Sequence, residues 1–464
     1  MPDVGILTNS GAETMVQAST FQAFQASVGG AIIRPGEAHY DSARKTWNGM
    51  IDKHPAVITR CTGVADVIAA VRFAREHDLL AAVRGGGHSL PGFSVCQGGM
   101  VIDLSPMKGL QVDPSKRTAV AQAGLTWGEY DRETQAFGLA STGGVISTTG
   151  IAGLTLGGGI GWLMRKYGLA CDHLRSVDVV TADGQFLTAS AMEHPDLFWG
   201  LRGGGGNFGI ATSFEYQLHP VGPVLAGMVI HPVDRAREVL RFYREFTPTA
   251  PDELTSYVFM LTTPEGVPVV AIMCCYCGDL SAGERVLQPL RTFGPPLADE
   301  VKPMPYQALQ SLLNDAYPAG LYSYYKSHNL SRISDELIDT MIDCFARVPS
   351  PMSALGFEQF GGAVRRVGVE DTAFRHRDVA YDIAILGEWA DQATSAVNVQ
   401  WVRDVASVTA PFSTGGVYVN FLGEEGEDQV KAAYGSHYQR LVALKRKYDP
   451  TNFFHLNQNI KPTA

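Results

Sequence analysis

Alternation of apolar and polar positions predicts a first β-α-β unit between residues 55 and 83. Apolar residues of the segment 62–78 recur at helical spacing behind Thr62, a residue type that often caps a helix. They are Val64, Val67, Ile68, Val71 and Ala74. The short apolar runs PAVITRC and LLAAV on either side predict buried strands. The second strand ends at the glycine-rich stretch RGGGHSLPGFS.

Residues 100–220 continue as short strands. The runs MVIDLS, LQVD and TAVAQAG predict three of them, and TWGEYDRETQAFG predicts a helix. The segment LRSVDVVTADGQFLTAS holds a DG turn between two strand patterns, which is typical of a hairpin. ATSFEYQLHP alternates like a half-buried strand.

The pattern changes near Pro220, where the glycine clusters stop. ELTSYVFMLTT and VPVVAIMCCYCG predict a long hairpin, and SALGFEQFGGAVRRV and YDIAILGEWA predict further strands. SAGERVLQPLRTFG and SDELIDTMIDCFARV are amphipathic, which predicts helices that cover an antiparallel sheet. The last part of the chain shows a strand pattern, GGVYVNFL, and then a helix that ends in RLVALKRKYDP. We therefore divide the chain into 1–222, 223–410 and 411–464.

Composition narrows the class of protein. Apolar residues make up 45% and charged residues 18% of the 464 residues, as in soluble globular proteins. The net charge of −10, without a basic stripe, predicts no nucleic-acid partner. No apolar run reaches the ~18 residues of a membrane span, so we expect no membrane partner. Seven cysteines are few and odd in number, which favours a reducing, cytoplasmic setting. We expect a monomer or a homodimer.

Glycine is the informative excess, since 19 of the 50 glycines lie between Gly85 and Gly168. They gather in the stretches 84–94, 141–150 and 153–161, with a further cluster at 203–209. Such turns expose backbone N–H groups that can bind a pyrophosphate or a flavin edge without a lysine. No GxxxxGK[ST] motif exists for a nucleoside triphosphate. One GxGxxG pattern ends at Gly209, but a strand pattern follows it where a Rossmann fold needs a helix.

His88 stands directly after three glycines, and its chemistry is open from local context alone. It is a structural histidine, a ligand, a base or a nucleophile. No HxH or HExxH motif and no Cys/His cluster accompanies it, so we predict no metal site. No G-x-S-x-G elbow is present for a charge relay.

Several long motifs, in order along the chain, carry a resemblance to a known family. They are RGGGHSLPGFSVCQGGMVIDLS, TTGIAGLTLGGGIGWLMRKYGLACDHL, DLFWGLRGGGGNFGIATSFEYQLHP, GGVYVNF and KYDPTNFFHLNQNI. The chain resembles the FAD-linked oxidases of the vanillyl-alcohol-oxidase superfamily, in the berberine-bridge-enzyme-like branch. Within it the chain is most similar to bacterial secondary-metabolism oxidases such as the enterocin polyketide-oxidising flavoprotein. The resemblance implies an α+β fold. A PCMH-type FAD-binding domain of two small α/β subdomains precedes a substrate domain with a large antiparallel sheet covered by helices, and 411–464 returns to the FAD domain.

The resemblance also implies where FAD binds. His88 would form a covalent bond to the flavin 8α-methyl, next to Arg84 and Ser89. No cysteine stands at 150–152, where many relatives carry a second link, so the attachment would be through His88 alone. The other implied cofactor-binding residues are Gly85, Gly86, Gly87, Gly143, Gly144, Gly150, Gly153, Gly157, Gly158, Gly159, Gly161, Gly209, Ile210, Tyr418, Asn420 and Asn457.

The implied reaction is a two-electron oxidation of a C–H/C–OH group in an alcohol, a sugar hemiacetal or a polyketide-type metabolite. Hydride would pass to flavin N5, and O2 would reoxidise the flavin to give H2O2. Tyr418 is the first choice for the base, although a phenol with a pKa of about 10 needs a cationic or donor neighbour to serve at pH 7. Glu358 and Gln359, on opposite faces of one strand, and Tyr167 are further candidates. A flavin dehydrogenase with another acceptor and a non-catalytic flavin- or ligand-binding protein are the alternatives.

Overall fold

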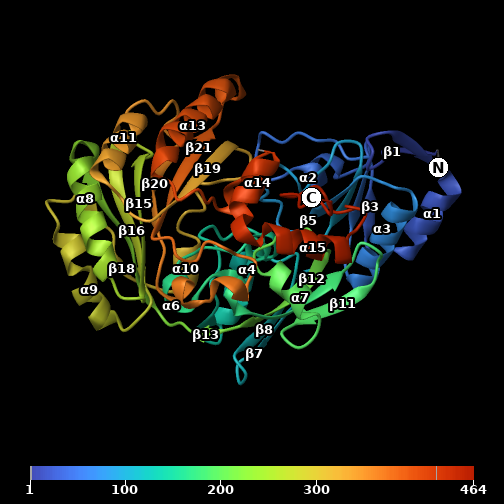
Figure 1. The fold of residues 1–464 in the computed structure, drawn as a ribbon, viewed down its shortest axis with the longest axis horizontal. Coiled ribbons are helices and arrows are strands. Elements are labelled where there is room, and N and C mark those ends of the chain that lie inside the picture. Colours follow the sequence, from blue (N-terminus) through green and yellow to red (C-terminus); the bar gives the residue numbers. More distant parts are fainter. Residues whose placement is uncertain (1–2, 425, 464) are drawn as a thin grey trace.

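A computed structural model describes residues 3–424 and 426–463 of the chain. Two small sheets and their helices form one half of the molecule, and a large sheet backed by helices forms the other (Figure 1). Two small sheets in one half and a large antiparallel sheet covered by helices in the other are the predicted α+β architecture, so the predicted fold class is confirmed.

The first small sheet contains the predicted β-α-β unit. Its strand order is β3-β4-β6-β5, with β4 and β5 both parallel to β6 between them and β3 antiparallel to β4. The elements are β3 (Ala31–Ile33), β4 (Val57–Arg60), α3 (Val64–Glu76), β5 (Ala81–Arg84) and β6 (Met100–Asp103). Thr62 does not cap α3 as expected. Gly63 is the cap residue, and the Thr62 hydroxyl donates instead to Asp66.

The second small sheet is antiparallel, with the order β11-β10-β12-β8-β7. Its strands are β7 (Leu110–Asp113), β8 (Thr118–Gln122), β10 (Leu174–Val180), β11 (Phe186–Ser190) and β12 (Ile210–Gln217). Strand β12 begins directly after Gly209, which confirms that the GxGxxG pattern is not a Rossmann motif. Helices α4 (Trp127–Gln135) and α7 (Pro195–Leu201) contact this sheet. Helices α5 (Ile151–Leu156) and α6 (Met164–Tyr167) lie between them in the chain, and α6 contacts the large sheet described below.

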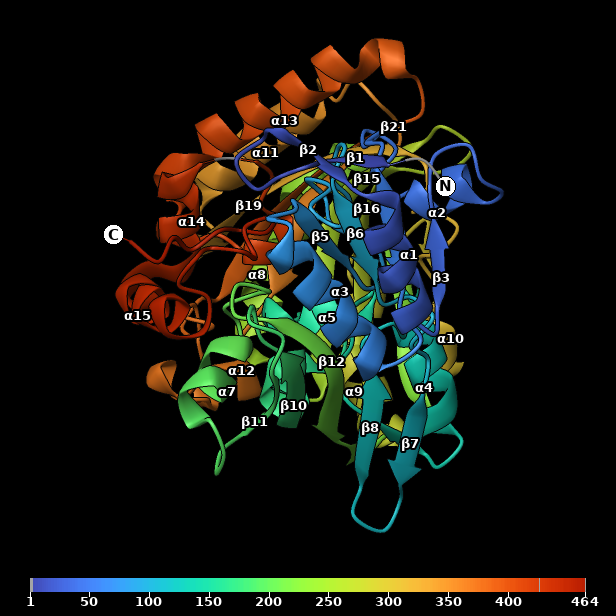
Figure 2. The same cartoon turned by 90° about the vertical axis from the view of Figure 1, so that its right-hand side faces the viewer.

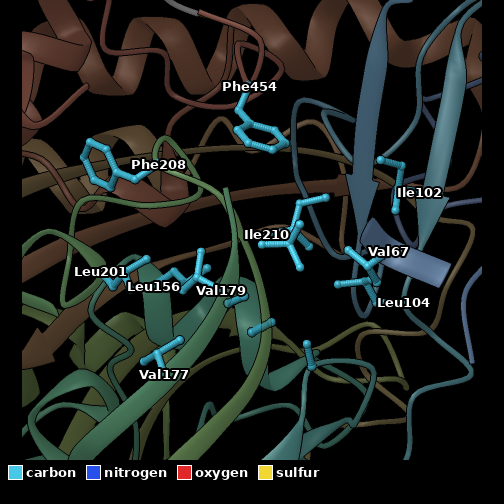
Figure 3. Packing of buried hydrophobic residues seen from close by; sticks show 14 of the residues in the cluster. Val67, Ile102, Leu104, Leu156, Val177, Val179, Leu201, Phe208, Ile210 and Phe454 are labelled. Carbon is cyan, nitrogen blue, oxygen red and sulfur yellow. The ribbon is translucent and has the colours of Figure 1, made fainter. Parts of the chain in front are cut away.

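One apolar core joins the two small sheets. In Figure 3 the side chains of Val67 and Ile102 from the first sheet region lie opposite Val179 of the second, with Ile210 between them. Phe454, from the last part of the chain, lies over the same core. Burial of this apolar surface fixes the strand ends, where the glycine segments begin.

The large sheet has eight strands, and all of its pairs are antiparallel. Its path is β17-β14-β16-β15-β20-β21-β19, and β18 also pairs with β14. The strands are β14 (Val224–Pro232), β15 (Leu254–Thr262), β16 (Pro268–Tyr276), β17 (Ala298–Asp299), β18 (Lys302–Met304), β19 (Tyr322–Leu330), β20 (Ala354–Gln359) and β21 (Tyr381–Trp389).

Four helices cover the outer face of this sheet (Figure 1, left). They are α8 (Ala236–Phe246), α9 (Leu280–Thr292), α11 (Asp335–Phe345) and α13 (Ser395–Thr409). Strand alternation sends Val258 and Met260 toward the helices, and Tyr257 and Phe259 toward the FAD-binding half. The inner face of the sheet therefore supplies one wall of the site.

The last part of the chain returns to the first half. Helices α14 (Glu427–Tyr434) and α15 (Tyr438–Tyr448) lie together on one side of the molecule, where α15 contacts α7 (Figure 2). The strand predicted for GGVYVNFL is wrong, because this segment forms a short 3₁₀ turn at Val419–Phe421. The Asn420 amide donates to the Leu154 carbonyl of α5 (3.2 Å), and this bond to a helix holds the segment outside a ladder.

The remaining elements are short. They are β1 (Val4–Leu7), β2 (Glu13–Val16), α1 (Ala18–Ser27), α2 (Tyr40–Arg44), β9 (Leu139–Ala140), β13 (His219–Pro220), α10 (Tyr306–Gln310) and α12 (Ala363–Arg366).

Candidate active site

A cavity of about 420 Å³ lies between the glycine segments and the inner face of the large sheet. The end of β5, the start of α5 and the start of β12 form one side of it. Strands β15, β16, β19, β20 and β21 form the other side, and segments 418–422 and 454–458 close it. Both halves of the fold and the last part of the chain thus meet at one cavity.

Most of the predicted glycines line this cavity, as do the predicted Ser89, Ile210, Asn420 and Asn457. The glycines are Gly85, Gly86, Gly87, Gly144, Gly150, Gly153, Gly157 and Gly209. Sequence reasoning did not single out Gly205 and Gly206, which also line it, although both belong to the cluster at 203–209.

Some glycines are required by the protein itself. A Cβ on Gly86 would overlap the backbone of Gly150, and one on Gly150 would overlap Gly86, so the two segments touch backbone to backbone. A Cβ on Gly157 would overlap the side chain of Asn420. These contacts explain the bare backbone that leads to His88, because no larger residue fits where the loops cross.

Two other glycines leave space for a ligand. A Cβ on Gly153 or on Gly206 would meet no protein atom within 4 Å, although both residues line the cavity. Packing within the protein therefore does not require glycine at these two positions, yet both lack a side chain on the cavity side. An anionic or flat group can approach such a surface closely. The lining fits a bound FAD on this observation.

His88 lies at the edge of the glycine-lined half. Its imidazole stacks on the indole of Trp47, with ring centroids 5.1 Å apart, and its Nδ1 lies 3.4 Å from the hydroxyl of Thr149. Burial lowers the pKa of His88 to about 4. The imidazole is therefore neutral at pH 7, the form that carries a nucleophilic lone pair.

Tyr418 and Asn420 both line the cavity, from the 3₁₀ turn rather than from a strand. The phenolic oxygen of Tyr418 accepts hydrogen bonds from Asn420 Nδ2 (2.8 Å) and from the backbone N–H of Ile160 (3.3 Å). These are the donor neighbours that a phenol base would need, yet burial still raises the pKa of Tyr418. Asn457 donates to the carbonyl of Gly206 (3.2 Å) and ties the tail to the last glycine cluster.

The sheet side of the cavity is apolar and aromatic. Tyr257, Phe259, Met273, Tyr325 and Leu386 line it. In the described part of the chain, no lysine or arginine side chain lines this cavity. The lining therefore favours neutral, ring-bearing molecules over anions.

Rings form a continuous arc along one wall. Centroid distances are 5.1 Å from Tyr418 to Phe421, 6.0 Å from Phe421 to Tyr325 and 6.5 Å from Tyr325 to Trp47. Trp47 then stacks on His88. The arc joins the tail, the large sheet and the FAD-binding half, and it fixes the relative positions of two phenols.

Glu358 is the carboxyl group that faces the cavity. It is 6% exposed, and its Oε2 has no hydrogen-bond partner among the described residues. Burial raises the pKa of Glu358 to about 8, so the group is neutral at pH 7. Tyr257 is its cross-strand neighbour, and the Tyr257 hydroxyl is also unpartnered within the described chain. Both groups are available to a ligand.

Two predicted catalytic residues do not reach the cavity. Gln359 points to the helix-covered face, where it accepts from Ser256 (2.8 Å) and donates to the Thr247 carbonyl (2.9 Å). Tyr167 stacks on His219 and donates to the Pro220 carbonyl (3.2 Å). Since strand alternation separates Glu358 from Gln359, the face that meets the cavity is that of Glu358.

Several predicted cofactor-binding residues lie behind the cavity wall. The guanidinium of Arg84 donates to the carbonyls of Ala43 and Lys45, so it holds a loop. The glycines among them meet protein atoms. A Cβ would contact Trp127 at Gly143, Phe374 at Gly158, Ala170 and Leu154 at Gly159, and the carbonyl of Gly143 at Gly161. Their bare backbone therefore serves the packing of the protein, and they do not line the cavity.

Trp47, Tyr325 and Glu388 were missed by sequence reasoning. Trp47 stands just after the weakly patterned first 45 residues, and its contacts lie far along the chain, since its Nε1 donates to the Tyr317 carbonyl (3.2 Å). Glu388 is buried behind the cavity wall, where it accepts from the Tyr325 hydroxyl. Glu388 is one of two charged residues, with Asp382, in the otherwise mostly apolar strand YDIAILGEW, and this was the only available signal.

The described residues contain no group of three or more His, Cys, Asp and Glu side chains placed to hold a metal ion. None of their helices has both the length and the apolar character of a membrane span. All seven cysteines are buried free thiols, and none of them lines the cavity.

Known proteins resemble this chain along nearly its whole length. Residues 55–190 match a family model described as FAD binding domain, and residues 417–461 match one described as berberine and berberine like. An FAD-linked oxidoreductase of Dictyostelium discoideum is 34% identical over 444 residues, which cover 95% of this chain and 96% of that one. The (R)-6-hydroxynicotine oxidase of Paenarthrobacter nicotinovorans is 30% identical over 453 residues, with 94% and 97% covered.

The fold has a solved counterpart. The crystal structure of 6-hydroxy-D-nicotine oxidase from Arthrobacter nicotinovorans superposes with a TM-score of 0.87 at 29% identity, covering 94% of this chain and 98% of that one. The two family matches fall on the glycine-lined half of the cavity and on the segments that close it.

Proposed function

This chain belongs to the berberine-bridge-enzyme-like FAD-linked oxidoreductases, and we propose that it oxidises the CH–OH group of a small neutral organic substrate, with O2 as the final electron acceptor. The observation that carries the proposal is the continuity of one cavity. It runs from the bare glycines beside His88 to the phenol- and carboxyl-bearing face of the large sheet. Cofactor and substrate would therefore share one space.

When bound, FAD would supply a hydride acceptor that can afterwards be reoxidised. Gly153 and Gly206 would face it with bare backbone. Asn420 and Asn457 would approach it from the closing segments. This assignment is supported by the relatives, which are FAD-linked enzymes by name.

We place a single covalent attachment on His88. The neutral imidazole is a competent nucleophile toward the flavin 8α-methyl at pH 7. Trp47 holds the ring by stacking on one face. No cysteine of the described chain lines the cavity, which supports one link rather than two.

The substrate class follows from the lining. Aromatic and apolar side chains form the sheet side, and Glu358 and Tyr257 add a few polar groups. A hydroxylated ring compound, such as an aromatic alcohol or a polyketide-type metabolite, fits this wall. An oligosaccharide fits it less well, because each buried hydroxyl would need a polar partner. A hydroxylated ring also occurs in the name of the 30% identical oxidase. The closer likeness to bacterial polyketide oxidases stays a prediction.

Tyr418 would orient the substrate. Its oxygen accepts from Asn420 and Ile160, which fixes the ring and leaves the hydroxyl proton free to point at a substrate oxygen. Protonated Glu358 would donate a second hydrogen bond from the sheet. The aromatic arc would exclude water from the reacting carbon.

The test is a peroxide-coupled screen of the purified holoenzyme against aromatic alcohols, phenolic polyketide analogues and sugars. We expect a yellow protein that forms one H2O2 per oxidised aromatic alcohol in air. Reduction of an artificial dye by substrate without peroxide would identify a dehydrogenase instead. A protein that is loaded with FAD but whose spectrum no member of the panel bleaches without oxygen would contradict the proposed activity.

A further inference from the structure

A second phenol, distinct from Tyr418, lines the cavity with a proton acceptor behind it. The hydroxyl of Tyr325 on β19 donates to Glu388 Oε1 on β21. Ser323, directly opposite Glu388 in the ladder, donates to the same oxygen at 3.3 Å. Tyr325 is 8% exposed and Glu388 is fully buried. Tyr325 lines the cavity and Glu388 does not, so a proton would pass between the cavity and the carboxyl group through the phenol.

Hydrogen bonds fix the backbone of Glu388, and one of its two carboxyl oxygens can take up a proton. The Ser353 hydroxyl accepts from the Glu388 N–H (3.0 Å) and donates to its carbonyl (3.1 Å), which fixes the backbone. Oε2 has no partner among the described residues. Burial raises the pKa of Glu388 to about 7. The titratable groups that face it are Tyr325 on β19 and Tyr317 from the preceding loop.

Tyr418 and Glu358, which also line the cavity, are poorer proton acceptors. The Tyr418 oxygen receives two N–H bonds, and no described carboxylate or carbonyl accepts its proton. Burial raises the pKa of Tyr418 and so opposes its ionisation. Glu358 is already neutral at pH 7.

The two phenols stand on the same wall. The ring of Phe421 lies between them, with centroids 5.1 Å from Tyr418 and 6.0 Å from Tyr325. Both phenols also line the same cavity, so a substrate that fills it would lie against both rings. Tyr418 can then donate a hydrogen bond to the substrate oxygen. The Tyr325 hydroxyl already donates its proton to Glu388, so its oxygen offers the substrate a lone pair.

We propose that Tyr325 and Glu388 form the proton-accepting pair of the oxidation, with Tyr325 as the catalytic residue and Glu388 as its positioning partner and final proton acceptor. The substrate O–H bond breaks as an O–H bond forms on Tyr325, and the former Tyr325 proton moves to Glu388 Oε1. The electrons of the substrate C–H bond leave with the hydride to FAD, so the products are a carbonyl compound, neutral Glu388 and reduced cofactor. This inference rests on the proposed function.

The experiment uses the FAD-loaded enzyme and two variants, Glu388→Gln and Tyr325→Phe. Glutamine keeps the shape and still accepts from Tyr325, but it cannot take up a proton. Asp131→Asn is the matched control, since Asp131 is also fully buried with a pKa raised to about 7, and it does not line the cavity. Anaerobic bleaching of the flavin by the best aromatic alcohol of the screen is measured from pH 5 to 9. Infrared difference spectra between the same pH values record carboxyl protonation without any substrate.

We expect the bleaching rate of the wild type to rise with pH through about 7, where Glu388 becomes ionised. Both variants should be slowed roughly 10²-fold or more and lose this pH dependence. Glu388→Gln should also remove one protonated-carboxyl band near that pH, whereas Asp131→Asn removes a different band and keeps the rate profile. Wild-type rates in Glu388→Gln, or an unchanged infrared spectrum, would overturn the pair. A wild type that no substrate bleaches rejects the proposed function instead, and the infrared spectra then decide alone whether Glu388 is a proton acceptor.

Discussion

The indole of Trp47 lies nearly parallel to the imidazole of His88, with ring centroids 5.1 Å apart and planes at 17°. Trp47 is itself held from two sides, since its backbone N–H donates to the Gly87 carbonyl (3.0 Å) and its Nε1 donates to the Tyr317 carbonyl (3.2 Å). The orientation of His88 is therefore controlled by the loop that holds Tyr317, in the half with the large sheet, as well as by its own glycine turn.

Loss of either ring should weaken flavin attachment. His88→Ala should leave no FAD on the protein after acid precipitation, because the proposed nucleophile is gone. Trp47→Leu should lower the attached fraction, since the imidazole is free to turn. Absorbance of the pellet and supernatant measures both. Trp401→Leu, which alters a buried indole among the outer helices, is the control for general destabilisation. Full attachment in His88→Ala would refute the covalent assignment.

The two classes of glycine should respond differently to alanine. Gly153→Ala places a methyl group in the cavity without touching protein atoms, and it favours helix α5 by up to about 1 kcal/mol. We expect an apoprotein of equal or higher melting temperature that retains less FAD. Gly86→Ala should lower both quantities, because its Cβ overlaps the backbone of Gly150. Thermal melts and the ratio of absorbance at the flavin and protein bands compare them. Normal FAD content in Gly153→Ala would show that the cofactor lies elsewhere.

Tyr418→Phe should slow flavin reduction by up to about 10-fold, the cost of one neutral hydrogen bond to the substrate. FAD content should stay normal, since the phenylalanine ring takes the place of the Tyr418 ring in the aromatic arc. The pH dependence of reduction should also stay, because Glu388 is untouched. Stopped-flow reduction across pH measures both effects. A loss of pH dependence in this variant would transfer the role of base to Tyr418.

Asp131→Asn should stabilise the protein at neutral and alkaline pH. Burial raises the pKa of Asp131 from 3.8 to about 7, so the folded state holds a proton that the unfolded state has lost. The wild type therefore loses stability as pH rises from about 4 to 7, by about 4 kcal/mol at most, and the loss stays constant above that. Asparagine still accepts from Gln310, whose amide donates to Asp131 at 2.8 Å. Chemical denaturation at pH 4, 6 and 8 should show a difference in the free energy of unfolding between variant and wild type that increases up to pH 7. An equal difference in the free energy of unfolding at every pH would contradict the raised pKa of Asp131.

Local patterns were enough for the parts of the fold that depend on near neighbours. The helix from Val64 and its two strands follow from side-chain periodicity over about 30 residues. The predicted antiparallel hairpin of β15 and β16 follows from two apolar runs around PEG. Glycine clustering also indicated correctly which loops line the cavity.

Contacts between distant segments could not be predicted in the same way. Gly150 and Gly161 look alike in sequence, but only the crossing of loops decides that Gly150 lines the cavity while Gly161 meets the carbonyl of Gly143. The alternation in GVYVNF indicated a strand, yet the Asn420 amide finds its acceptor on α5 and the chain turns. Glu388 is recognisable only once β19 brings Tyr325 beside it.

The tail also has a consequence for the order of events during synthesis. Lys445 is fully buried, where it pairs with Asp449 (2.7 Å) and donates to the carbonyls of Asn207 and Phe454 (both 2.8 Å). This clasp brings residues 454–458 over the last glycine cluster, although more than 200 residues separate the two in the chain. A ribosome must therefore make both halves and the clasp before the cavity closes. A nascent chain that has only its first half therefore lacks both the sheet wall and the tail segments of this cavity.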